Sequence, residues 1–221
     1  MNFQILLYAH IAFGMVSLIA GAVSGFSTKG SPLHRKSGKT FAVSMLLAAT
    51  SAIALSIIRP SSFLLAIGLF TLYLILSGWI WVRRIPQSRK VKLSRYAAIF
   101  GMAVALFMFY QSLTISRGIP VILLIFGSIL LGFSILDLIR KPNPINNVRI
   151  HAGRMGGAYI ASFTAFIVTN LAGMLPDLVL WIGPTPIGSV LIALGIRAYY
   201  KKQKLGKRKV RQPVKKMGGR D

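Results

Sequence analysis

Histidine and aspartate are the side chains of this sequence best suited to bind a metal ion or to move a proton. They are few, and together they comprise His10, His34, His151, Asp137, Asp177 and Asp221. A neutral imidazole ligates a metal ion or haem iron and accepts protons near neutral pH. The chain has no cysteine, which excludes disulfides, thiolate metal sites and thiol nucleophiles. Site chemistry must therefore come from histidine, aspartate and the basic side chains.

Two polar segments, 29–39 and 149–155, each hold one histidine beside arginine or lysine residues. In the first segment, Ser31 followed by Pro32 is typical of a helix N-cap with proline at the first helical position. This pattern puts His34 in the first turn of a helix.

The second segment follows Asn146 and Asn147, which can cap a helix and put His151 in its opening turns. Asp137 ends the preceding apolar run, and a carboxylate at the C-terminal end of a helix is unfavourable unless it is paired. We therefore predict that Asp137 pairs with Arg140, Arg149, His151 or Arg154. These residues form a predicted site on the side of the membrane that the basic residues, discussed below, predict to be cytoplasmic. The site comprises His34, Arg35, Asp137, Arg140, Arg149, His151 and Arg154.

The chemistry open to this site is haem or metal ligation by His34 and His151, proton handling, or anion binding at helix N-termini. The alternative is that each histidine contacts a lipid headgroup or makes a structural hydrogen bond. A shared site requires the two histidines to lie beside each other.

A second polar set is predicted in the outer half of the chain's membrane region, and it comprises His10, Gln111, Asn170 and Asp177. Ionisable residues within the membrane face the bundle or a cavity, which makes them functional candidates. His10 could bond to Asn170 or Asp177, and a single interhelical hydrogen bond would also explain it.

Long apolar runs must position these residues. The 221-residue chain is 54% hydrophobic and 14% charged, against roughly 25% charged in an average soluble domain. A spanning helix needs about 20 mostly apolar residues. Seven runs satisfy this: 4–25, 40–58, 62–82, 96–116, 119–138, 151–174 and 178–198. The predicted fold is an all-α integral membrane bundle of seven transmembrane helices.

Basic residues predict the orientation of this bundle. The chain has 27 Lys and Arg against 3 acids, for a formal net charge of +24. All the bases except Arg59 and Arg117 fall in alternate loops or in the tail, which predicts that the N-terminus is outside and the C-terminus inside. Residues 1–198 form one predicted bundle, and 199–221 a disordered basic cytoplasmic tail. Because the bases follow membrane topology, we expect the bilayer and its anionic headgroups as partners, and not nucleic acid.

Small residues four apart indicate where helices approach closely. Gly21 and Gly25 lie in the first run, and Ala161 and Ala165 in the sixth. Such spacing lets helix backbones meet within lipid. We therefore expect the first and sixth helices at the centre of the bundle.

Several short motifs recur in an order and spacing that point to a known family. They are His10, His34-Arg35-x-x-Gly38, Asp137-Leu138-x-Arg140, Arg149-x-His151-x-x-Arg154-Met155 and Ala161-x-x-Thr164-Ala165-Phe166. Up to about residue 175 the chain resembles a bacterial multi-pass membrane family, domain-of-unknown-function family 2306. The resemblance implies a bacterial inner-membrane location and a shared role for the three histidines, with no established activity or cofactor.

Three functions are consistent with these patterns. The first is a protein that binds a redox cofactor or a metal ion through its histidines, or that assists a respiratory complex, which would be its membrane-protein partner. The second is a small-solute or proton transporter or channel lined by the outer polar set. The third is a structural or anionic-lipid-binding protein. An enzyme is not favoured, because the chain has no Glu and no HExxH, P-loop, nucleophile-elbow or dinucleotide motif.

Overall fold

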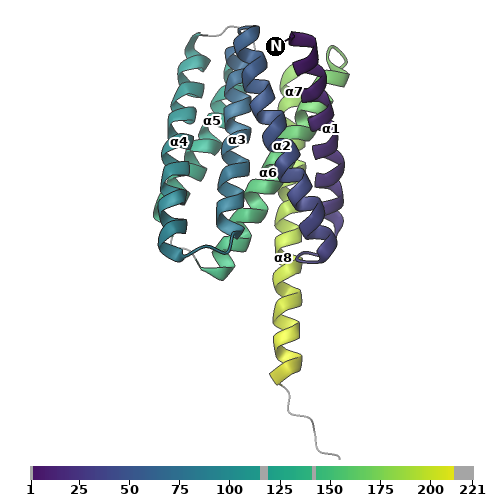
Figure 1. The fold of residues 1–221 in the computed structure, drawn as a ribbon, viewed down its shortest axis with the longest axis vertical. Helices are drawn as coiled ribbons and strands as arrows, with labels where there is room; N and C mark the ends of the chain where they lie inside the picture. Colours follow the sequence, from purple (N-terminus) through teal and green to yellow (C-terminus); the bar gives the residue numbers. More distant parts are fainter. Residues whose placement is uncertain (1, 115–118, 141–142, 212–221) are drawn as a thin grey trace, which may run out of the picture.

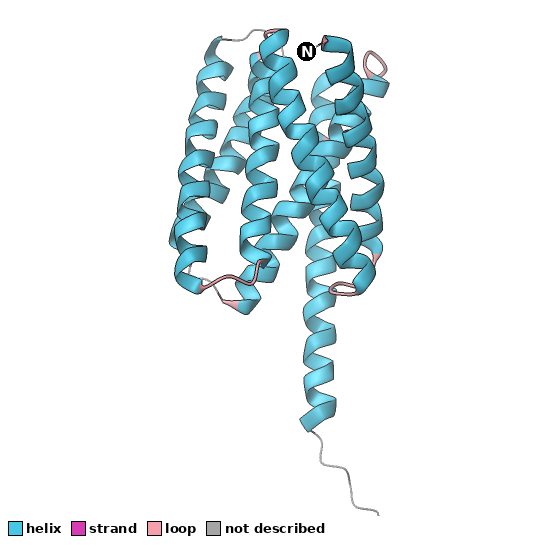
Figure 2. Cartoon of the chain, in the orientation of Figure 1, coloured by secondary structure: helices cyan, strands magenta, loops and turns pink. Residues whose placement is uncertain are grey.

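The computed structural model describes residues 2–114, 119–140 and 143–211 of the chain. Within these residues the chain forms eight helices joined by short loops, so the predicted all-α bundle is confirmed (Figure 2). The helices are α1 (Phe3–Phe26), α2 (Pro32–Ile58), α3 (Ser62–Val82), α4 (Gln87–Thr114), α5 (Ile119–Ile139), α6 (Pro144–Leu171), α7 (Asp177–Ile182) and α8 (Pro184–Arg211).

Six stretches are long and apolar enough to cross a membrane: α1 to α4, Pro120–Ile139 and Asp177–Lys204. The sixth predicted span corresponds to α6, which is not among these six stretches. The seventh, predicted as one helix over 178–198, is broken between α7 and α8 at Gly183 and Pro184. Proline lacks a backbone N–H and favours the first helical position, which explains why a new helix starts there.

The helices pack with α3 at the centre of the bundle. It contacts α2, α4, α5 and α6, whereas α1 packs on α2 and α6 at the side opposite α4 (Figure 1). The expectation that α1 lies at the centre is therefore wrong. In α3, Tyr73, Leu74 and Ile75 are fully buried. Gly101 of α4 admits this packing, because a Cβ there would lie 2.8 Å from the Tyr73 ring.

The loops gather at two ends of the bundle. Loops 27–31 and 83–86, the end of α5, the start of α6 and the projecting half of α8 lie together at one end (Figure 1). We call it the basic end, since the described bases other than Arg59 are found on or near it. The predicted cap is confirmed there: Ser31 caps α2, and its Oγ accepts a hydrogen bond from the backbone N–H of His34 at 3.1 Å.

Two helix boundaries differ from the sequence-based predictions. α6 begins at Pro144, so Asn147 lies within its first turns, and its N–H donates to the carbonyl of Asn143 at 2.8 Å. The predicted caps at Asn146 and Asn147 are thus wrong, because Pro144 takes the favoured first position. At the other boundary, α8 continues to Arg211, so residues 199–211 are helical and not disordered. Lysine, arginine and glutamine are good helix formers, which explains the extension. The rest of the predicted tail, 212–221, lies outside the described residues.

Candidate functional site

A buried ion pair joins α5 to α6 in the half of the bundle near the basic end. Asp137 is 1% exposed and Arg154 is 4% exposed. Nη2 of Arg154 lies 2.9 Å from Oδ1 of Asp137. The prediction that Asp137 pairs with a base of this hairpin is confirmed, and the partner among the four predicted is Arg154.

Two hydroxyl groups of α3 complete the environment of the carboxylate. Tyr73 Oη and Ser77 Oγ each donate to Oδ2 of Asp137 at 2.7 Å. Residues four apart lie on the same face of a helix, so α3 presents both donors together. Asp137 thus accepts three hydrogen bonds from two neighbouring helices, which offsets the cost of burying its charge.

The guanidinium of Arg154 is held by more than the carboxylate. Its Nη2 also donates to the carbonyl of Phe133 at 3.1 Å. Its Cζ lies 3.7 Å from the centroid of the Phe133 ring, within range of a cation–π contact. On α3, Gly78 lets α6 approach, because a Cβ there would lie 2.9 Å from the Cβ of Arg154. We call Asp137, Arg154, Tyr73 and Ser77 the ion-pair cluster.

His151 lies one turn before Arg154 on α6 and binds the same part of α3. Its Nδ1 is 3.0 Å from the carbonyl oxygen of Gly78. A carbonyl oxygen only accepts, so Nδ1 carries the proton and donates it to this bond. In the neutral ring, Nε2 then keeps a lone pair that can ligate a metal ion or accept a proton.

His34 is held in the same manner within the hairpin formed by α1 and α2, by a hydrogen bond from α2 to α1. Its Nδ1 donates to the carbonyl of Ser24 at 3.0 Å and lies 3.2 Å from the Oγ of Ser24. The Ser24 carbonyl also accepts from Nζ of Lys29 at 3.1 Å, and partial burial lowers the pKa of that lysine. These contacts satisfy carbonyls that the end of α1 leaves without intrahelical partners. They also leave Nε2 of His34 as the open nitrogen.

His34 and His151 lie close enough to interact electrostatically, although α2 and α6 are far apart in sequence. Asp137 does not join them, since its hydrogen bonds go to Tyr73, Ser77 and Arg154. Among the described residues, no three His, Cys, Asp or Glu side chains are grouped to hold a metal ion. The predicted site therefore separates into a histidine pair, His34 and His151, and the ion-pair cluster.

The other predicted members of the site lie at its margins. Arg35 and Arg149 are exposed, and Arg140 is half-buried. The guanidinium Cζ of Arg149 lies 5.7 Å from the centroid of the Tyr200 ring, which links α6 to the projecting part of α8. These arginines supply positive charge near the basic end without contacting the carboxylate of Asp137.

The predicted outer polar set is not brought together. His10 donates from Nδ1 to the carbonyl of Ala48, and lies 3.0 Å from the Oγ of Ser51 on α2, so it does not pair with Asn170 or Asp177. Asn170 bonds to the carbonyl of Phe166 in its own helix, and Asp177 is exposed. Gln111 lies on α4, at the side of the bundle opposite α1 (Figure 1). Each of these amides finds a local partner, so no shared site forms.

Sequence reasoning missed four residues of the site, which are Tyr73, Ser77, Gly78 and Phe133. Their signal is weak, since a tyrosine and a serine four apart in an apolar run fit ordinary helix packing. The contacts that give them a role come from α5 and α6, at least 60 residues away in the case of Asp137 and Ser77.

The fold and its long apolar helices are those of a polytopic α-helical membrane protein. No protein-family model, curated protein or solved structure matches the chain. Membership of family 2306 therefore stays a prediction from the motifs.

Proposed function

We propose that the chain is a bacterial inner-membrane protein that binds a transition-metal centre, either haem iron or a metal ion, through His34 and His151. The observation that carries the proposal is the shared state of the two rings. Each donates its Nδ1 proton to a backbone carbonyl, of Ser24 or of Gly78. Metal-binding histidines commonly fix the second ring nitrogen in this way, which orients Nε2 and raises its basicity.

The ion-pair cluster supports this proposal from beside the histidine pair. Arg154 lies one turn after His151 on α6, and its guanidinium is held on three sides by Asp137, Phe133 and Tyr73. A rigid α6 keeps the His151 ring in one orientation. Because the pair of charges is neutral overall, the cluster orders the helices without adding net charge beside a metal.

Bound haem or metal would supply one-electron chemistry at the basic end of the bundle. In the proposed orientation this end faces the cytoplasm, since it carries the excess of lysine and arginine. Such a centre would act with a membrane-protein partner, for example a respiratory complex that it assists.

Purified protein tests the proposal through its absorbance spectrum and its metal content. We expect a Soret band if the centre is haem, or about one transition-metal ion per chain if it is not. A preparation with neither, after expression with haem precursor and metal salts, would contradict the proposal.

A further inference from the structure

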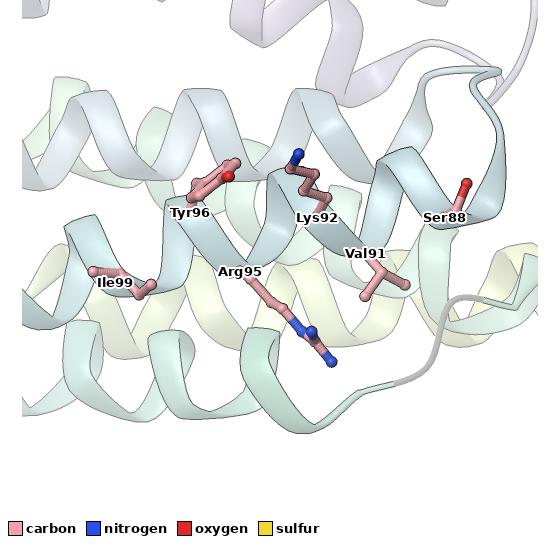
Figure 3. Close-up of a pocket in the computed structure, with 6 residues that line it drawn as sticks. All are labelled: Ser88, Val91, Lys92, Arg95, Tyr96 and Ile99. Atoms are coloured by element: carbon pink, nitrogen blue, oxygen red, sulfur yellow. The ribbon is translucent and has the colours of Figure 1, made fainter.

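A groove of about 470 Å³ runs along the surface of α4 near the basic end. It is lined by Ser88, Val91, Lys92, Arg95, Tyr96 and Ile99 (Figure 3). The spacing of three and four residues puts all six on one face of the helix. In Figure 3, Lys92 and Tyr96 lie together on one side of this face, and Arg95 extends to the other.

The cations of this groove, Lys92 and Arg95, lie nearer the start of α4 than the apolar Ile99. The predicted span over 96–116 begins at Tyr96, so Ser88, Lys92 and Arg95 lie outside the apolar layer. Tyrosine is enriched at the boundary between membrane and water, where Tyr96 falls. Ile99 lies within the predicted span and is 60% exposed. The groove therefore presents cations at headgroup depth and an apolar surface at acyl-chain depth.

The two cations of the groove have no carboxylate to neutralise them within the described residues. Asp137 is committed to Arg154. Asp177 begins α7 at the end of the bundle away from the groove (Figure 1), and Asp221 lies outside the described residues. Lys92 and Arg95 are both exposed on the same helical face. Their charge is available to an anion from outside the chain.

We propose that this groove binds an anionic phospholipid, with the phosphate between Lys92 and Arg95. Ser88 and the Tyr96 hydroxyl supply further donors, and an acyl chain covers Ile99. The apolar half of the groove favours a lipid over free phosphate, which would leave it uncovered. Arginine and lysine beside a membrane attract anionic headgroups, and each basic residue contributes to the affinity.

A second groove provides an internal comparison. It has a volume of about 430 Å³ and lies between α1 and α2. It is lined by Phe13, Val16, Lys39, Thr40, Val43, Ser44 and Leu47. It has the same order of polar and apolar residues but only one cation, Lys39. The α4 groove, with two cations, is accordingly the stronger site for an anionic headgroup.

Native mass spectrometry of the full chain tests the proposal, with phosphatidylglycerol and phosphatidylcholine added in separate titrations. Wild-type protein should bind phosphatidylglycerol in preference to phosphatidylcholine. The double variant Lys92→Gln/Arg95→Gln should weaken phosphatidylglycerol binding about 30-fold and leave phosphatidylcholine binding unchanged. The control Lys201→Gln/Lys202→Gln removes the same charge from exposed positions of α8 and should keep wild-type affinity.

Equal losses in the two double variants would overturn the proposal, because the effect would then follow net charge and not the groove. Displacement of phosphatidylglycerol by millimolar inorganic phosphate would also overturn it, since the site would then take free anions. Ser88→Asp keeps both cations and puts a negative charge in the groove. It should weaken phosphatidylglycerol binding too, and wild-type affinity in this variant would contradict the assignment even if the double variant failed to fold.

Discussion

Asp137 and Arg154 lie inside the bundle and pair with each other. The carboxylate accepts from Arg154, Tyr73 and Ser77. Removal of one member of a buried ion pair leaves the other charge without compensation, which is more destabilising than removal of both. We therefore expect that substituting one charge of the cluster lowers the stability of the protein more than substituting both.

We predict that Asp137→Leu lowers the free energy of unfolding by about 3–5 kcal/mol, because it leaves the Arg154 guanidinium buried beside Phe133 without a counter-charge. Thermal or denaturant unfolding of the protein in detergent measures the change. The double variant Asp137→Leu/Arg154→Met should recover much of the loss, since no uncompensated charge remains. A double variant less stable than Asp137→Leu alone would contradict this explanation.

The three histidines share one structural state at the residue scale. Each donates Nδ1–H to a backbone carbonyl of another helix: Ala48, Ser24 or Gly78. The neutral rings consequently present Nε2 as the nitrogen with a lone pair. His10 differs from the other two in its place, because it lies on α1 near the end of the bundle away from the basic end (Figure 1). It therefore serves as a chemical control for His34 and His151.

At the scale of elements, α1 has two glycines four residues apart, Gly21 and Gly25, and only Gly21 lies where α1 packs closely against α6. A Cβ at Gly21 would clash with the Tyr159 ring and lie 3.0 Å from the Phe41 ring. A Cβ at Gly25 would have no neighbour within 4 Å. Close approach is therefore confined to Gly21, and the paired spacing overstates the contact.

We predict that Gly21→Ala destabilises the protein by about 1–3 kcal/mol through overpacking against Tyr159. Gly25→Ala is the matched control on the same helix, and it should leave the unfolding temperature unchanged or slightly higher, since alanine favours the helix. Melting curves of both variants in the same detergent measure the difference. Equal effects of the two substitutions would contradict the proposed role of Gly21.

The sequence patterns predicted the helices more accurately than they predicted which helices pack against one another. Apolar runs identify spans because lipid requires backbone groups to be satisfied within each helix. Ser31 and Pro32 likewise mark the start of α2 by local chemistry. The order in which helices pack has no such local signal, so α3 was not predicted as the centre. The break at Gly183 and Pro184 was missed because the surrounding run is apolar throughout.

For the site, too, predictions from local chemistry were more accurate than predictions that depend on which helices pack together. Pairing of Asp137 followed from the chemistry of one helix end and a short hairpin, and Arg154 confirms it. The roles of Tyr73 and Ser77 depend on hydrogen bonds to Asp137, which follows them in the chain by 64 and 60 residues. His10 was assigned to Asn170 or Asp177 by depth alone, whereas α2 supplies the nearer partner at Ala48.

At the scale of the whole molecule, we predict that the basic end faces the cytoplasm. Lysine and arginine in short loops keep those loops on the cytoplasmic side. A green fluorescent protein fused after Asp221 should fluoresce, and alkaline phosphatase at the same position should be inactive. Loop 59–61, at the other end, should give an active alkaline phosphatase fusion. The reverse pattern would contradict the orientation.

The central claim is that His34 and His151 bind one metal centre together, and the metal or haem content of matched variants tests it most directly. Wild-type protein should carry about one centre per chain. His34→Ala and His151→Ala should each reduce this content to a small fraction, because each removes one imidazole ligand. His10→Gln should retain the wild-type content. Metal or haem retained in both alanine variants, or lost equally in His10→Gln, would contradict the claim.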